Sequence, residues 1–153
     1  MKWKHPQLVK LYEAIGCVAD GRVEVSGDTA KVYSSSRNKY YDISYDPENQ
    51  AIMSNDNSSF WKGILGYPAV GYLLKIGVLP YDPQMGESMK GIAWKDINQK
   101  YKNNFDKALE FILSTKSENE RALLLSYVHK IDDEIKKLDL KMLGKRTTPP
   151  EGY

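Results

Sequence analysis

The stretch FWKGILGYPAVGYLLKIGVLPY, residues 60–81, decides the fold, because it is the only long apolar segment and charged, patterned sequence lies on both sides of it. A transmembrane helix needs about 20 consecutive apolar residues. The run without charge extends only from Gly63 to Leu74, and a lysine closes it at each end. The stretch therefore predicts helices buried within a protein core, and it argues against a membrane span.

Proline and glycine divide this stretch into short helices. Pro68 suits the first position of a helix, where a missing N–H costs nothing, and Gly77 suits the left-handed position just past the end. A helix is therefore expected over Pro68–Ile76. Upstream, Ser58 or Ser59 is expected to cap a shorter turn over residues 60–65, which Gly66 ends.

Glycines within these two short helices leave two interpretations open. Glycine lets helices pack closely, which favours a core, and it also permits hinge motion, which favours a lid over a ligand site. The core is our main prediction. The lid is the alternative, with Gly63, Gly66 and Gly71 as its hinges.

The composition predicts one domain over residues 1–143, followed by a disordered tail over residues 144–153. Hydrophobic residues make up 41% and charged residues 27% of the 153 positions, which is typical of a soluble globular protein. The net charge of +2 is too small to predict polyanion binding by itself. No apolar segment typical of a signal peptide follows the N-terminus, so we expect a cytoplasmic location.

Alternating apolar residues after position 21 predict antiparallel strands. Gly27-Asp28 is a two-residue hairpin signal, and such a loop determines which residues face each other. The predicted pairs are Val23 with Val32 and Val25 with Ala30 on one face, and Glu24 with Lys31 and Arg22 with Tyr33 on the other.

Two further turns extend this hairpin into a four-stranded meander. The turn near Ser36-Arg37 is expected to pair Val32 with Tyr41, Tyr33 with Tyr40 and Lys31 with Asp42. The turn over residues 46–50 leaves two registers open, one with Ile43 opposite Met53 and Tyr45 opposite Ala51, the other with Ile43 opposite Ile52. The side chains expected to face inward are Val23, Val25, Val32, Tyr41, Ile43 and Tyr45.

Helical periodicity appears before and after this predicted sheet. A helix is expected over residues 6–15, with a possible extension to Gly21, and residues 81–90 are expected to form a loop. A long helix from Ile92 or Asp96 to Leu113 then precedes a capping box at Ser117 and a last helix that reaches about Leu143. The predicted fold is therefore α+β, with an N-terminal helix, the meander, two short apolar helices and a long helical hairpin.

Catalytic and metal-binding signatures are absent from the sequence, so it predicts no cofactor, no metal and a non-catalytic role. Cys17 is the single cysteine, and this excludes an intramolecular disulfide and a cysteine-rich zinc site. His5 and His129 lie near opposite ends of the chain, which gives Cys17 no local base. We expect Cys17 to be a buried structural thiol.

The last helix suggests the leading functional hypothesis. Leu124, Val128, Ile131, Ile135, Leu138 and Met142 form a heptad seam, flanked by Leu123, Leu125, Tyr127 and Leu140. This apolar surface is wider than one antiparallel helix covers. It predicts a binding or assembly protein that associates with itself, as a homo-oligomer, or with another protein.

Two alternative hypotheses concern other surfaces. The outer sheet face carries basic and aromatic residues of the kind that stack on single-stranded nucleic acid, although a solvent-exposed face with cross-strand charge pairs is the more common reason for such residues. These residues are Arg22, Lys31, Tyr33, Arg37, Lys39 and Tyr40. The other alternative is a small-ligand protein or enzyme with a cleft beside residues 60–81. Its wall would be formed by Trp61, Tyr67, Tyr72, Tyr81 and Trp94.

Overall fold

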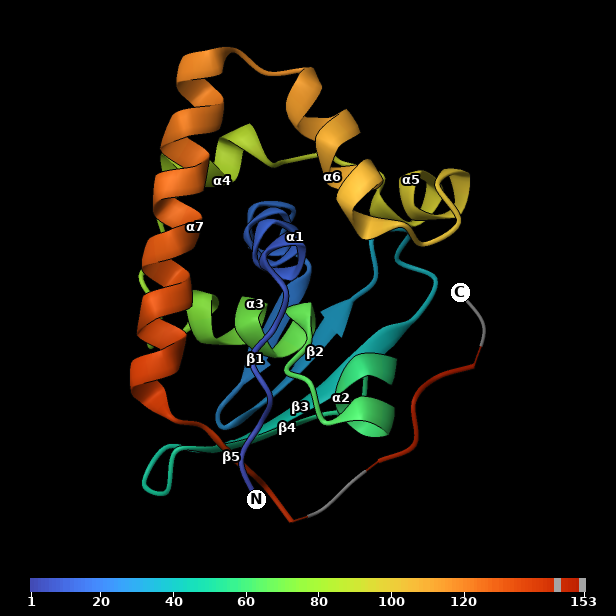
Figure 1. The fold of residues 1–153 in the computed structure, drawn as a ribbon. Helices are drawn as coiled ribbons and strands as arrows, with labels where there is room; N and C mark the ends of the chain where they lie inside the picture. The colour runs from blue at the N-terminus through green and yellow to red at the C-terminus, as the bar shows by residue number, and fades with distance from the viewer. Residues whose placement is uncertain (145–146, 152–153) are drawn as a thin grey trace.

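The computed structural model describes residues 1–144 and 147–151 and has an α+β fold (Figure 1). The helices are α1 (Leu8–Ala19), α2 (Asn57–Lys62), α3 (Tyr67–Lys75), α4 (Pro83–Ser88), α5 (Trp94–Lys100), α6 (Phe105–Ser114) and α7 (Glu118–Leu138). The strands are β1 (Val23–Ser26), β2 (Thr29–Tyr33), β3 (Tyr40–Asp46), β4 (Ala51–Ser54) and β5 (Lys141–Met142). Each helix in the described part of the chain is too short or too polar to cross a membrane.

The five strands form one sheet in the order β1-β2-β3-β4-β5. The first three pairings are antiparallel, as predicted for a meander, and β5 adds a parallel edge strand that the sequence analysis did not foresee. The first two hairpins have the predicted registers, with Val23 opposite Val32 and Val32 opposite Tyr41. Helix α3 packs on the first four strands, and α1 packs on α3.

The third hairpin differs from both predicted registers. Tyr45 lies opposite Ile52, and Ile43 lies opposite Ser54, because the loop contains four residues, 47–50. Gln50 adopts a left-handed conformation with φ of 49°, which lets the chain reverse after a loop of this length. The observed register pairs two buried side chains, Tyr45 and Ile52, across the strands.

Five of the six side chains predicted to face inward are buried, and Val25 is the exception. Val25 is 40% exposed because it lies on the edge strand β1, beside the turn at Gly27. Its partner Ala30 is buried. Val25 therefore has its predicted partner but is not buried, because strand alternation indicates which way a side chain points and not how far the covering helices reach.

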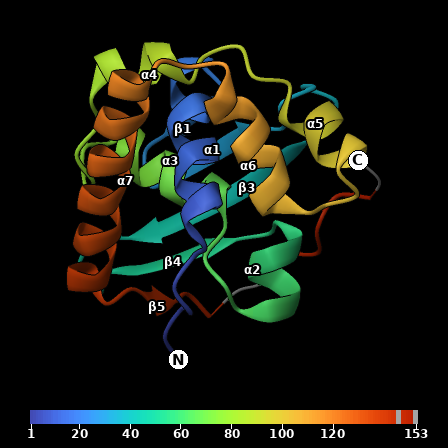
Figure 2. The same ribbon diagram turned by 45° about the horizontal axis from the view of Figure 1, so that its top comes forward.

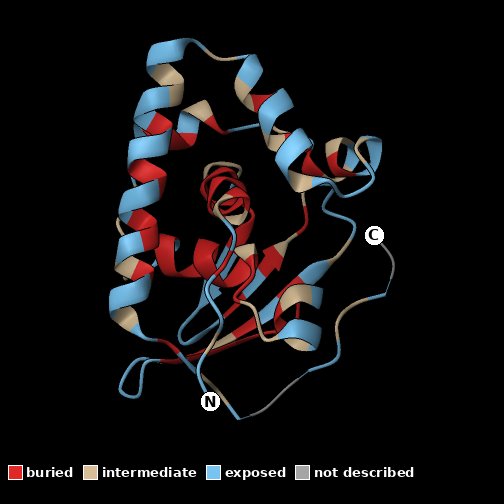
Figure 3. Cartoon of the chain, in the orientation of Figure 1, coloured by how far each residue is buried: buried red, intermediate tan, exposed pale blue. Residues whose placement is uncertain are grey.

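The central apolar stretch is part of the core. Helix α3 begins with Tyr67 and Pro68, and every residue from Pro68 to Leu74 is buried (Figure 3). Helix α2 starts earlier than predicted, because Asp56 and not a serine caps it. It also ends earlier, at Gly63, which has a φ of 66°.

Helix α1 lies at the centre of the molecule and contacts α3, α4, α6 and α7 (Figure 2). All residues from Leu11 to Val18 are buried. Gly16 allows this close packing, because a β-carbon there would lie 2.7 Å from the backbone oxygen of Met89. The free thiol of Cys17 is buried in the same helix.

The second half of the chain departs from the sequence prediction at three places. The predicted loop over residues 81–90 contains α4, which Asp82 caps with its side chain. The predicted long helix is broken into α5 and α6, because Lys102 and Asn103 both have positive φ. Helix α7 starts with the predicted serine cap but ends at Leu138, where Asp139 turns left-handed and leads into β5.

The predicted disordered tail lies partly outside the described residues, since 145–146 and 152–153 are not described. Within residues 147–151, the backbone oxygen of Thr148 accepts a hydrogen bond of 3.2 Å from the side-chain amide of Asn55.

Candidate functional site

A cavity of about 410 Å³ opens beside the N-terminal half of α1. Its walls come from α1, the connection between β2 and β3, helix α2, the start of α3 and the segment from α5 to α6. Cavities of about 300–1,000 Å³ are typical of small-molecule sites. This cavity is therefore at the small end of the range, with room for a compact metabolite.

The cavity wall carries more positive than negative charge. Four lysines line it, namely Lys10, Lys39, Lys62 and Lys95. Among the residues that the structure describes, the carboxylates in the same wall are Glu13 and Asp56, so the described wall has a formal excess of two positive charges. A cleft lined mainly by charges of one sign concentrates the electrostatic potential, so the cavity favours an anionic occupant.

Glu13 is a buried carboxyl group within this wall. Burial raises its pKa, Lys10 and Arg22 oppose that rise, and the charge of Asp56 adds to it. The ammonium of Lys10 lies 3.6 Å from Oε2 of Glu13, so this lysine already has a counter-charge. Burial, together with the charge of Glu13, also raises the pKa of Tyr67 well above its ordinary value.

Asp56 has a structural role at the base of the cavity. Its Oδ1 accepts hydrogen bonds of 2.6 Å from the hydroxyls of Ser54 and Ser59, and its Oδ2 accepts one of 3.2 Å from the Ser59 amide. The Ser59 hydroxyl in turn accepts the Gly66 amide at 3.3 Å. This network caps α2 and connects it to the start of α3.

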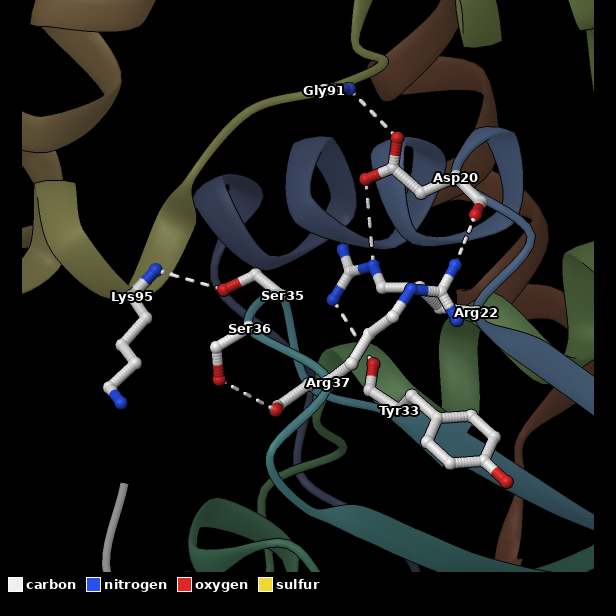
Figure 4. A network of polar contacts seen from close by, with 9 residues as sticks. Asp20, Arg22, Tyr33, Ser35, Ser36, Arg37, Gly91 and Lys95 are labelled. Atoms are coloured by element: carbon white, nitrogen blue, oxygen red, sulfur yellow. Dashed lines mark hydrogen bonds and ion pairs between the residues drawn. The ribbon is translucent and has the colours of Figure 1, made fainter.

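Residues 34–39, between β2 and β3, form the wall that carries Lys39. The Ser34 amide donates to the backbone oxygen of Lys39 at 2.9 Å, which closes the turn. Ser35 Oγ accepts the backbone amide of Lys95 at 3.0 Å and so joins this turn to the start of α5 (Figure 4). Burial lowers the pKa of Lys39, and the positive charge of Lys95 lowers it further.

A buried arginine holds the end of β2, which leads into this turn. Arg22 is 1% exposed; its guanidinium donates to the backbone oxygen of Tyr33 at 3.1 Å and lies 3.5 Å from a carboxylate oxygen of Asp20 (Figure 4). Asp20 also accepts the Gly91 amide at 2.8 Å, and its backbone oxygen accepts Arg37 Nη2 at 2.8 Å. The network connects the end of α1 to residues 34–39, which include Lys39, and to Gly91, which lies shortly before Lys95.

Two of the five aromatic residues predicted to form a pocket do line the cavity. Tyr67 is partly buried, and Trp61 is 68% exposed at the cavity surface. Tyr72 and Trp94 are each 1% exposed within the core, and Tyr81 packs against that core on another side. The structure thus places Trp61 and Tyr67, from the N-terminal part of the central stretch, at this cavity, whereas α3 turns Tyr72 into the core.

The six residues predicted for nucleic-acid stacking separate into three environments. Lys31, Tyr33 and Tyr40 do lie together, with the two rings 5.9 Å apart and the lysine 4.9 Å from the Tyr40 ring. Arg22 is buried and Arg37 supports Asp20, so the prediction that Arg22 lies on the outer face is wrong. Lys39 lines the cavity.

Most of the charged wall was missed by sequence reasoning. Lys10, Glu13, Lys62 and Lys95 come from three separate segments and form no spacing motif. Only the burial of Glu13 on the apolar side of α1 distinguishes it from an ordinary surface glutamate. Among the described residues, no group of three or more histidine, cysteine or acidic side chains is arranged to hold a metal ion.

Comparisons with known proteins place the chain in a family without adding a function. No curated protein and no solved structure matches it. Residues 3–141 match the family described as "Uncharacterised conserved protein UCP014422", and the chain belongs to that family.

Proposed function

We propose that this protein binds a small organic anion in the cavity beside α1. The observation that carries the proposal is that, among the described residues, four lysines and two carboxylates line a cavity sized for a small molecule. Tyr41, Tyr67 and Phe105 add aromatic surface to the same wall. A few charged groups within a partly aromatic concave wall are typical of metabolite sites.

The rigidity of the walls also supports ligand binding. The Asp56 and Ser59 network connects α2 to α3, and the Arg22 and Asp20 network connects α1 to the lysine-bearing loops. Walls whose positions are determined by hydrogen bonds need little reorganisation when a ligand binds, and this lowers the entropic cost of binding.

Thermal unfolding in the presence of small solutes tests the proposal. Citrate, AMP and glucose 6-phosphate represent anions, glucose is the neutral control, and spermidine is the cationic control. A ligand at about 100 times its Kd stabilises the folded state by about 2.7 kcal/mol, enough to raise Tm by several degrees. At least one anion is expected to raise Tm, and neither control compound should.

Charge reversal assigns the effect to the cavity. Lys95→Glu should remove the stabilisation by anions, because the reversed charge repels them from the wall. Lys130→Glu changes the net charge equally at an exposed position of α7 and should retain the effect. Equal loss in both variants, or no response to any anion, would contradict the proposal.

Self-association through α7 is a second candidate function. Leu123 and Leu125 are 50% and 45% exposed, and this observation favours it. The heptad-seam residues Leu124 and Val128 are buried against the molecule's own helices. Contacts between copies would therefore use the exposed side chains that flank the seam, Leu123 and Leu125. Light scattering at high concentration tests this candidate, since the protein should be larger than a monomer and Leu123→Ser with Leu125→Ser should reduce its mass. A monomer at every concentration would exclude it.

A further inference from the structure

We infer that the anion bound in the cavity carries a hydroxyl group, and that this hydroxyl donates a hydrogen bond to the carboxylate of Glu13. The ligand class is therefore a hydroxy acid or another hydroxylated organic anion. This inference rests on the proposed function, which supplies the attraction for an anion, and it adds the group that distinguishes one anion from another.

The two carboxylates that line the cavity within the described residues differ in the hydrogen bonds that the protein donates to them. Both oxygens of Asp56 have donors, namely the hydroxyls of Ser54 and Ser59 at 2.6 Å and the Ser59 amide at 3.2 Å. Among the described residues, Glu13 has an ion pair with Lys10, whose ammonium lies 3.6 Å from Oε2, longer than a normal hydrogen bond. Asp56 therefore serves the fold, and Glu13 keeps acceptor capacity for a ligand.

Glu13 is accessible to a ligand although it is largely withdrawn from water. An ionised carboxyl group can accept about four hydrogen bonds on its two oxygens. The side chain of Glu13 is only 8% exposed and the residue lines the cavity, so a molecule in the cavity can contact it where bulk water is scarce. Burial raises the pKa of Glu13, which is the direction expected for a carboxyl group with too few donors. A hydroxyl of the ligand would supply the missing donor.

The surroundings of Glu13 favour a hydroxyl over an ammonium group as that donor. Besides its ion pair with Glu13, the ammonium of Lys10 lies 4.0 Å from the centre of the Phe105 ring, a cation–π contact that holds the charge in place. This charge repels a second cation at Glu13 but not a neutral hydroxyl. Tyr67 lines the same cavity, and burial raises its pKa well above the ordinary value, so its hydroxyl stays protonated and can donate. A ligand hydroxyl can accept from Tyr67 while it donates to Glu13, which an ammonium group cannot do.

Anions that differ at a single group test the inference. Succinate, malate and aspartate share one dicarboxylate skeleton and carry hydrogen, hydroxyl and ammonium at the same carbon, and tricarballylate and citrate differ by a hydroxyl. Malate and aspartate are measured as both enantiomers. Isothermal titration at low salt is expected to show at least one hydroxylated anion binding about tenfold or more tightly than its partner without the hydroxyl. Where malate binds, aspartate should bind more weakly.

Variants at Glu13 then assign this preference to its carboxylate. Glu13→Met has a side chain of similar length without an oxygen, so the preference for the hydroxylated anion should fall to about twofold or less. The partner without the hydroxyl should bind no more weakly to Glu13→Met, because a negative charge is removed from the wall. Glu110→Met, at an exposed position of α6, is the control and should keep the preference. Circular dichroism confirms folding, and if Glu13→Met is unfolded, Glu13→Gln is measured and should lower the preference by a few-fold.

The outcomes separate this inference from the proposed function. If each anion without the hydroxyl binds as tightly as its hydroxylated partner, or if Glu13→Met keeps the full preference, the inference is wrong while anion binding stands. If aspartate binds more tightly than malate, Glu13 pairs with an ammonium group and the hydroxyl assignment is wrong. If no anion binds, the proposed function fails as well.

Discussion

Asp56 and Gly66 pack so closely that a β-carbon on Gly66 would lie 2.2 Å from Oδ2 and 2.7 Å from Cγ of Asp56. The Asp56 carboxylate has no room to retreat, because Ser54 and Ser59 hold it with hydrogen bonds and it is buried. The absence of a side chain at Gly66 is therefore a condition for the carboxylate that caps α2 and forms the base of the cavity.

Gly66→Ala is expected to destabilise the protein by about 2 kcal/mol, because the added methyl group displaces a buried, hydrogen-bonded carboxylate. Urea unfolding measures the loss. Gly144→Ala is the matched control and should change the stability little, since a β-carbon there would have no atom of a described residue within 4 Å, its chain neighbours apart. An unchanged midpoint for Gly66→Ala would show that Asp56 can move without cost.

Gly71 distinguishes a packed core from a mobile lid. A β-carbon at Gly71 would lie 3.7 Å from Cys17 Sγ and from Val23, which is ordinary contact distance, so Gly71→Ala should be tolerated. Gly71→Leu should cost about 3 kcal/mol, since the larger side chain overpacks the contact between α3 and α1. Thermal unfolding of the two variants provides the comparison, and similar Tm values would favour the lid.

The ionisation of Asp132 is expected to make the free energy of unfolding depend on pH in the acid range. Burial raises the pKa of Asp132, but hydrogen bonds from His5 and Lys136 outweigh this effect and place the pKa below its ordinary value. A folded-state pKa below the unfolded value means that ionised Asp132 stabilises the protein above about pH 4. This stabilisation is lost as the pH falls through the folded-state pKa.

Asp132→Asn is therefore expected to reduce the free energy of unfolding by about 1 kcal/mol at pH 7. The difference from the unsubstituted protein should shrink as the pH falls through the folded-state pKa of Asp132, because below that pKa both proteins carry a neutral side chain at this position. Urea unfolding at several pH values measures the trend. Asp133→Asn, at the exposed neighbouring position, should show almost no difference at any pH.

The ionisation of Glu13 is expected to change the free energy of unfolding with pH in the opposite direction. Burial raises the pKa of Glu13, so the folded state binds its proton more tightly than the unfolded state does. Stability contributed by the protonated group is present below the unfolded pKa of about 4.3 and is lost as the pH rises through the folded-state pKa. Glu13→Gln removes this loss, since glutamine is neutral throughout.

Relative to the unsubstituted protein, Glu13→Gln should therefore gain stability as the pH rises from about 4.3, the ordinary pKa of glutamate, towards neutrality. Unfolding curves across this range measure the difference. Glu110→Gln, at an exposed position of α6, is the control and should show no such trend. A pH-independent effect of Glu13→Gln would contradict the raised pKa.

Cys17 should be unreactive in the folded protein. Burial raises the pKa of its thiol to about 12, so almost no thiolate forms near neutral pH. Labelling by a thiol reagent is expected only at the rate at which the protein unfolds. Lys130→Cys, which adds an exposed thiol, should label rapidly at one equivalent. Rapid modification of Cys17 itself would show that α1 opens readily.

Local chemistry explains why the sequence predicts the first two hairpins. The two-residue turn at Gly27-Asp28 determines the register, and alternation places Val32 and Tyr41 on one face. The third register was wrong because its longer turn permits several loop lengths. The sequence does not indicate the left-handed conformation at position 50, because the residue there is Gln50 and not a glycine or asparagine.

Some helix boundaries are likewise marked in the sequence, and others are not. Ser117 and Glu120 mark the start of α7 unambiguously, and the serine accepts the Glu120 amide at 3.1 Å. The break between α5 and α6 depends on two non-glycine residues with positive φ, Lys102 and Asn103, which apolar periodicity passes over. Helical periodicity thus predicts that a segment is helical, but not always where it is interrupted.

The sequence by itself determined the α+β class, the first hairpin register and the burial of the central stretch, because turns, caps and periodicity act over a few residues. Tertiary structure alone decided the cavity. Lys10, Lys39 and Lys95 are far apart in the sequence, and they line one cavity only after α1 is buried and Ser35 bonds to the start of α5. A site assembled from distant segments depends on long-range packing, and no local pattern encodes it.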